Sequence, residues 1–208
     1  MKITAEFEGL DEFADLMAKF PEASVTAQRM AINQVAQRGA LNLARDAILG
    51  EINFPKDYLK GDRLKVSKLA TDNSLEAVIT ARKRATSLAR FAAPGTPLGS
   101  NARRGVRVQV KTAGGSILLR RAWLVRLRQG ASLTEDAYNV GLAVRVRPGE
   151  SIIGKRTVHK SWLVKDAVAL LYGPSVDQVF REVADQIAPR VAQMTAAEFQ
   201  RQFARLTS

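Results

Sequence analysis

The sequence predicts an α+β fold, with a long N-terminal helix, a mostly antiparallel sheet of about five to six strands and a C-terminal helix. Apolar residues recur at helical spacing over residues 22–49 and again over residues 176–199. Between these segments, short runs alternate between apolar and polar residues and are separated by turn-forming residues. Such consecutive hairpins disfavour a parallel sheet, because parallel strands need long crossovers between them.

With 208 residues and a hydrophobic fraction of 46%, the chain is long and apolar enough for one folded domain. We expect three segments within it: a strand and helices over residues 1–50, a β-rich basic core with long loops over residues 51–172, and a C-terminal helix over residues 173–208. No apolar run approaches the roughly 20 residues that span a bilayer, and the polar N-terminus lacks the pattern of a signal peptide. We therefore expect no membrane association.

The N-terminal third predicts one strand and two helices. Residues 2–8 alternate between apolar and polar side chains, which is typical of a half-buried strand. Asp11 is suited to cap a short helix, and Pro21 to the first turn of a second, long helix, which Gly50 is expected to end. The apolar stripe of the long helix has one weak point at Gln34 and is rich in alanine, which allows another helix or a sheet to approach closely. Its members are Ala27, Met30, Ala31, Val35, Leu41, Ala44 and Ile48.

The middle of the chain predicts strands joined by turns. Residues 63–67 and 76–81 alternate on either side of a polar turn at residues 71–74, which predicts a hairpin. Residues 106–111 form a second alternating run, and Gly114-Gly115 is suited to the turn after it. The next strand is expected to carry Ile117, Leu119 and Trp123 on one face, although Arg121 breaks the alternation.

A further strand is expected over residues 140–147, and two long loops over residues 92–105 and 150–160. Residues 162–172 fit either a strand or a short helix, because their periodicity does not decide between the two. Tyr172, Gly173, Pro174 and Ser175 then predict a rigid turn, in which glycine supplies backbone freedom, proline fixes φ and serine caps the last helix. Pro189 is expected to kink or split that helix, because it lacks the N–H and clashes with the preceding turn.

The positive charge is concentrated in one stretch, residues 77–134, which contains no Asp and no Glu. Its cations equal in number the net charge of +12 of the whole chain, so the remainder is neutral on balance. We predict that these cations form an interaction surface: Arg82, Lys83, Arg84, Arg90, Arg103, Arg104, Arg107, Lys111, Arg120, Arg121, Arg126 and Arg128.

Three interpretations of this stretch remain open: a nucleic-acid-binding surface, a protein interface and a solvated face. Arginine and lysine suit phosphates, but only Phe91 and Trp123 interleave them, and single-stranded nucleic acid is usually bound on more aromatic platforms. Recognition-helix motifs are absent. Arginine is also enriched at protein interfaces, because its fork pairs with carboxylates and stacks on aromatic rings.

No catalytic, metal-binding or cofactor-binding residues are predicted, and we expect no enzyme. The chain has no cysteine, and its single histidine, His159, cannot form an ordinary zinc site alone. No glycine-rich stretch has phosphate-binding spacing. The acidic residues near the N-terminus have three interpretations: ligands of a divalent ion, favourable charges at a helix N-terminus, or a negative surface for the basic face of a neighbouring copy. They are Glu6, Glu8, Asp11, Glu12 and Asp15.

Several blocks, in this order, resemble the prophage minor tail protein Z family. The first blocks are Phe54-Pro55-Lys56-Asp57-Tyr58-Leu59, Arg63-Leu64-Lys65-Val66, Leu75-Glu76-Ala77-Val78-Ile79 and Thr86-Ser87-Leu88-Ala89-Arg90-Phe91. The later blocks are Ala122-Trp123-Leu124-Val125-Arg126-Leu127, Asn139-Val140-Gly141-Leu142-Ala143 and Leu171-Tyr172-Gly173-Pro174-Ser175-Val176. The resemblance extends over residues 54–180, and the N-terminal third is similar only in helical character.

The resemblance implies a structural virion protein of a tailed bacteriophage that acts in tail completion at the head–tail junction, or neck. It implies assembly in the host cytoplasm and a place at the head-proximal end of the tail. The implied partners are further copies of the chain, in a hexameric ring, and other tail and neck proteins such as a tail terminator and a tail tube. It implies no enzymatic activity and no cofactor. The alternative is a basic nucleic-acid-binding protein that contacts duplex DNA.

Overall fold

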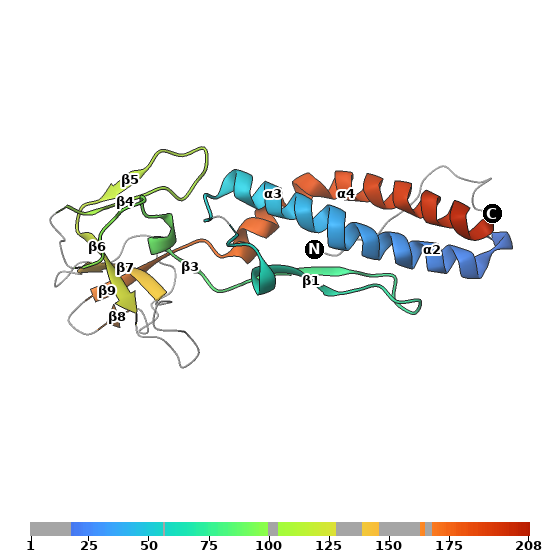
Figure 1. Cartoon of the computed structure of the whole chain (residues 1–208), viewed down its shortest axis with the longest axis horizontal. Coiled ribbons are helices and arrows are strands. Elements are labelled where there is room, and N and C mark those ends of the chain that lie inside the picture. Colours follow the sequence, from blue (N-terminus) through green and yellow to red (C-terminus); the bar gives the residue numbers. More distant parts are fainter. Residues whose placement is uncertain (1–17, 56, 100–103, 128–138, 146–162, 165–167) are drawn as a thin grey trace. The chain divides into compact units, whose positions relative to one another are not determined.

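The computed structural model of the chain describes residues 18–55, 57–99, 104–127, 139–145, 163–164 and 168–208. They combine helices with antiparallel sheets, which confirms the predicted α+β class (Figure 1). The chain forms two compact units. The helical unit comprises Met1–Gly50, Asp57–Lys83 and Val176–Ser208, and the sheet unit comprises Glu51–Lys56 and Arg84–Ser175. The segment expected over residues 51–172 is thus divided between the two units.

The predicted long helix is present as three consecutive pieces: α2 (Pro21–Gln34), the π-helical turn η1 (Val35–Ala40) and α3 (Leu41–Glu51). Pro21 occupies the first turn, as predicted, where its missing N–H costs no helical hydrogen bond. The predicted stop at Gly50 is wrong, because α3 includes this glycine and ends one residue later.

A second long helix, α4 (Val176–Thr207), runs antiparallel to α2 in the helical unit (Figure 1). Ala27 and Ala31 of α2 form a buried cluster with Phe199 and Phe203 of α4, whose side chains are each 1% exposed. The two phenylalanine rings stack with their centroids 5.8 Å apart. The small alanine side chains let these rings approach the α2 backbone, so the alanine-rich stripe is a helix-packing face.

Pro189 lies inside α4, and the helix continues through it, so it does not split the helix. Proline in a helix interior costs about 3 kcal/mol or more, because it removes one hydrogen bond and clashes with the preceding turn. Ile187 and Val191 flank the proline, and both are buried. Tertiary packing on both sides of the proline therefore holds the flanking turns helical.

The first predicted hairpin is confirmed and packs on the helices. Strands β1 (Leu64–Lys68) and β2 (Val78–Ala81) pair antiparallel, and Thr71 and Ser74 exchange two backbone hydrogen bonds at the polar turn between them. Buried Ile32 and Ala36 contact Ala70 and Ala77 of the hairpin, with Val66 and Leu75 packed against this cluster.

Asn33 of α2 joins this hairpin to the helix. Its side-chain amide donates to the carbonyl of Ala70 at 3.0 Å, and its side-chain oxygen accepts from the Ala70 N–H at 2.7 Å. The side chain thus satisfies both backbone groups of a buried residue, as a neighbouring strand would.

Replacing Asn33 with alanine is expected to destabilise the helical unit by about 1–3 kcal/mol, because both backbone groups of Ala70 lose their partner. Chemical denaturation followed by far-ultraviolet circular dichroism measures the change. Asn42→Ala is the matched control, since Asn42 is exposed on α3 and accepts a local hydrogen bond from Arg45, three residues away. Equal effects of the two substitutions would contradict the proposed role of Asn33.

The sheet unit is built on a five-stranded antiparallel sheet. Its strands are β3 (Thr86–Ser87), β9 (Val168–Gly173), β7 (Asn139–Arg145) and β6 (Ala122–Leu127) in spatial order, and β8 (Leu163–Val164) also pairs with β9. Within the undecided stretch at residues 162–172, the described residues 163–164 and 168–172 therefore belong to strands. Strand β7 is central, and its residues 141–143 are buried.

A separate hairpin joins β4 (Val106–Val108) to β5 (Ile117–Leu119), with the predicted glycine pair in its turn. The single strand expected from Ile117 to Trp123 is wrong. Arg120 and Arg121 form a turn between β5 and β6, which accounts for the break in alternation at Arg121. The two strands then pair with different partners, β4 and β7.

Some expected features lie outside the described residues: the strand over residues 2–8, the start of the helix capped by Asp11, the N-terminal acidic residues and the whole loop over residues 150–160 with His159. Among the helices that are described, none is both long and apolar enough to cross a membrane.

Candidate interaction surface

The predicted interface cations fall into three groups. Arg82 and Lys83 belong to the helical unit, and Arg103 and Arg128 lie outside the described residues. The others belong to the sheet unit, where all of them are exposed: Arg84, Arg90, Arg104, Arg107, Lys111, Arg120, Arg121 and Arg126. The sheet unit therefore carries most of the charge, on a stretch of chain without carboxylates.

Several of these cations gather on the β4–β5 hairpin and its ends, which we call the basic hairpin (residues 104–121). Arg107 lies on β4 between the buried Val106 and Val108, and therefore faces outward. Its Nη1 donates to the hydroxyl of Ser116 at 3.2 Å, so the guanidinium extends across to β5. Lys111, which is exposed, adds a positive charge at the turn end of the hairpin.

Gly105 holds the opposite end of the basic hairpin together. Its φ of +67° is favourable only for glycine, and a Cβ at this position would lie 2.6 Å from the carbonyl oxygen of Leu119 and 2.7 Å from the Cα of Arg120. This close approach brings Arg104, which precedes the glycine, next to the end of β5. The backbone geometry at Gly105 therefore holds the positively charged residues Arg104 and Arg120 near one another.

Exposed apolar side chains accompany the cations on β5. Ile117 is 64% exposed and Leu118 is 42% exposed. The register pairs Leu118 with Arg107 on one face of the hairpin and Ile117 with Val108 on the other. Each face of β5 therefore offers an uncovered aliphatic side chain, and one face adds a guanidinium. Large uncovered apolar side chains next to cations are typical of protein interfaces.

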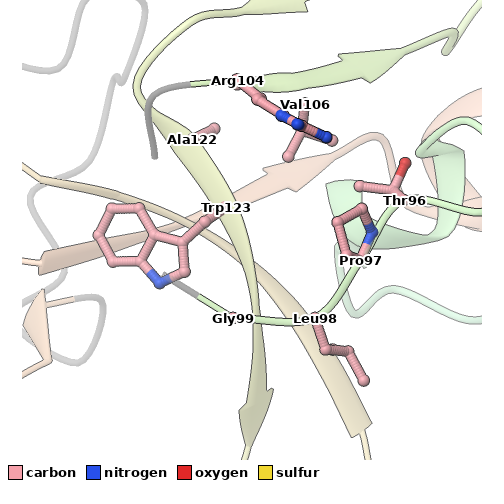
Figure 2. A pocket seen from close by; sticks show the side chains of 9 residues that line it. Thr96, Pro97, Leu98, Gly99, Arg104, Val106, Ala122 and Trp123 are labelled. Atoms are coloured by element: carbon pink, nitrogen blue, oxygen red, sulfur yellow. The ribbon is translucent and has the colours of Figure 1, made fainter. Parts of the chain in front are cut away.

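A pocket of about 400 Å³ lies at the base of the basic hairpin. Trp123 of β6 and Arg104 both line it and come from different segments (Figure 2). Its wall is fixed to β6, because the N–H of Gly99 donates to the carbonyl of Leu124 at 3.0 Å. Tryptophan and arginine are the residue types that most often dominate binding at protein interfaces. The complete lining is Thr96, Pro97, Leu98, Gly99, Arg104, Gly105, Val106, Ala122 and Trp123.

The turn predicted over Tyr172, Gly173, Pro174 and Ser175 is only partly present. Tyr172 and Gly173 are the last residues of β9 and pair with β3, and only Pro174 and Ser175 lie between β9 and α4. Ser175 is 3% exposed and directly precedes the first residue of α4, at the capping position. The carbonyl of Pro174 accepts from the N–H of Thr86 at 3.4 Å. Gly173 has no positive φ, so the backbone freedom expected of it is not used. A Cβ there would instead lie 3.1 Å from Cδ2 of Leu88, so the glycine serves close packing.

In the part of the chain that the structure describes, no three His, Cys, Asp or Glu side chains are grouped to hold a metal ion. The residues of the basic hairpin contribute positive charge, aliphatic surface and backbone edge, and they include no general base or carboxylate. The chemistry available to this surface is binding: attraction of carboxylates or phosphates, burial of aliphatic side chains and pairing with an extended strand.

Neither the exposed apolar edge nor the pocket was predicted from the sequence. A sequence pattern for the edge did exist: Ile117, Leu118 and Leu119 are consecutive apolar residues in a strand, where side chains alternate between faces. The apolar side chains on one face of the strand are then exposed, unless both faces of the strand are covered. No comparable pattern predicts the pocket, because segments distant in sequence line it.

Comparison of the chain with models of known families, with curated proteins and with solved structures finds no match.

Proposed function

We propose that the protein is a structural virion protein of a tailed bacteriophage, which acts in tail completion at the head–tail junction and assembles as a ring with other tail and neck proteins. The resemblance of residues 54–180 to the minor tail protein Z family suggests this role. The observation that carries an assembly function is the basic hairpin, where exposed cations stand beside Ile117 and Leu118. Further copies of the chain and an adjoining tail protein are the proposed partners.

The apolar part of this surface favours a protein partner over DNA. Burial of apolar surface contributes roughly 25 cal/mol for each Å² removed from water, and a protein face can cover Ile117 and Leu118 in this way. A phosphate backbone recognises charge and leaves such side chains uncovered. The pocket whose lining includes Trp123 and Arg104 strengthens the preference, because it offers a recess for an anchoring side chain.

Sedimentation velocity tests the assembly function. We expect the purified protein to form an oligomer of defined size, and the triple variant Arg104→Glu/Arg107→Glu/Arg120→Glu to associate roughly 100-fold more weakly, since reversed charges repel a matched partner by several kcal/mol. The control Lys19→Glu/Arg38→Glu/Arg190→Glu makes the same change in net charge at exposed positions of the helical unit. A wild-type protein that is monomeric and absent from purified virions would refute the proposed function.

The rival function, binding of duplex DNA, is favoured by the acid-free stretch of residues 77–134. It predicts an affinity that falls steeply with salt, in proportion to the number of phosphates contacted. The double variant Ile117→Ser/Leu118→Ser separates the two functions. It should weaken protein assembly, which buries these side chains, and leave DNA affinity and its salt dependence unchanged.

A further inference from the structure

The outer edge of β5 is a free strand edge in the part of the chain that the structure describes. β5 pairs with β4 alone. The other edge of β4 is already occupied, because Val108 forms a bridge with Ala92, and the N–H of Ala93 donates to the carbonyl of Arg107 at 2.9 Å. Exposed strand edges present unpaired N–H and C=O groups and readily accept an added strand.

The two faces at this edge call for different side chains in an incoming strand. On one face Ile117 and Leu119 lie opposite Val108 and Val106, so apolar neighbours fit there. On the other face Leu118 lies opposite Arg107, whose guanidinium reaches the hydroxyl of Ser116 at 3.2 Å and so lies toward the edge. Arg120 follows at the end of the strand. An incoming strand with apolar residues on one face and carboxylates on the other would match both.

Residues 2–8 of this chain have that pattern. Ile3, Ala5 and Phe7 share one parity. The other parity carries Glu6 and Glu8 together with Thr4 and one cation, Lys2. In a strand, residues of one parity lie on one face, so this segment would place its apolar residues beside Ile117 and its carboxylates beside Leu118 and Arg107. The segment lies outside the described residues, and its sequence alone makes it the candidate.

We infer that β5 accepts residues 2–8 of a second copy of the chain as an added strand. The inference rests on the proposed assembly function and names its contact. Donation of an N-terminal strand from each copy to the next is a head-to-tail contact, and such contacts close into a ring when the rotation between copies permits. The acidic segment and the basic hairpin are then the two halves of one interface.

Disulfide trapping tests the contact, because the chain contains no cysteine and every thiol is therefore an introduced one. Mixtures of two single-cysteine proteins report contacts between copies. Thr4→Cys is expected to cross-link with Leu118→Cys, and Ala5→Cys with Ile117→Cys, in each case at least tenfold faster than the mismatched pairs, since side chains of opposite parity lie on opposite faces. Gln37→Cys, exposed on η1, is the control for random collision.

Two results would overturn the inference. One is cross-linking that is no faster than with Gln37→Cys or that ignores parity. The other is cross-linking only within a chain, seen when the double variant Thr4→Cys/Leu118→Cys forms an internal disulfide at high dilution while the mixed single variants do not react. Sedimentation of the same proteins under reducing conditions distinguishes two causes of a failed cross-link. If the protein sediments as an oligomer, only this contact is wrong. If it sediments as a monomer, the proposed assembly function is wrong as well.

Discussion

Replacing Gly105 with alanine is expected to destabilise the sheet unit by about 2–5 kcal/mol. A left-handed backbone costs an L-residue roughly 1–2 kcal/mol, and an overpacked contact costs a further 1–3 kcal/mol or so. The added Cβ would lie 2.6 Å from the Leu119 carbonyl oxygen and 2.7 Å from the Cα of Arg120. Both are backbone atoms, so no side-chain rotation can relieve the clash.

Urea denaturation followed by tryptophan fluorescence measures this effect, because Trp123 and Trp162 both belong to the sheet unit. Gly115→Ala is the matched control. It lies in the turn of the same hairpin, has no positive φ, and has open space where its Cβ would stand. We expect a change within about 0.5 kcal/mol for this control. If Gly105→Ala lowered the free energy of unfolding no more than Gly115→Ala does, residue 105 would not lie as close to the end of β5 as described.

Replacing Phe199 with alanine is expected to destabilise the helical unit by about 3–5 kcal/mol, the usual cost of removing a fully buried phenylalanine ring. The side chain is 1% exposed, stacks on Phe203 and packs against Ala27 and Ala31. Those alanines are too small to fill the cavity left behind. Denaturation followed by far-ultraviolet circular dichroism reports mainly on this unit, because it contains α2, α4 and most of α3.

Phe20→Ala makes the same chemical change at a side chain that is 44% exposed, just before α2. Its smaller buried area predicts a cost of about 1 kcal/mol or less. A similar loss of stability in both variants would mean that the ring of Phe199 is not enclosed between α2 and α4. Unchanged tryptophan fluorescence of Phe199→Ala under native conditions would show that the sheet unit keeps its fold.

Periodicity predicted the elements whose stability depends on local pattern. The amphipathic stripe from Ala27 to Ile48 and the alternation around residues 71–74 each fix which face is buried, so the two helices and the first hairpin followed directly. The apolar stretch at residues 162–172 stayed undecided because a strand with apolar residues of both parities looks like a buried helix. Its pairing with β7, distant in sequence, decides in favour of a strand.

The charge of the interaction surface could be predicted from the sequence, but its structure could not. The high density of arginine over residues 77–134 predicted exposed side chains there, since arginine is seldom fully buried. The turn at Arg120 and Arg121 redirected the chain and separated β5 from β6, and this left Ile117 and Leu118 exposed. Such an outcome depends on the fit of whole strands to their neighbours, which no local pattern encodes. The continuation of α4 through Pro189 likewise depends on tertiary packing, which no local pattern encodes.

The π-helical turn η1 determines where the helix that contains it can lose a residue. Buried positions recur every four residues at Ala27, Ala31 and Val35, and the series restarts one residue later at Ala36, Ala40, Ala44 and Ile48. A π turn is an α-helical turn widened by one residue. Removing one residue from this turn would let it close into an ordinary α-helical turn and join the two series into one, so Ala44 and Ile48 would keep their phase. The same deletion elsewhere in α2 or α3 would rotate everything beyond it by about 100°. The helix can therefore lose a residue more readily within residues 35–40 than outside them.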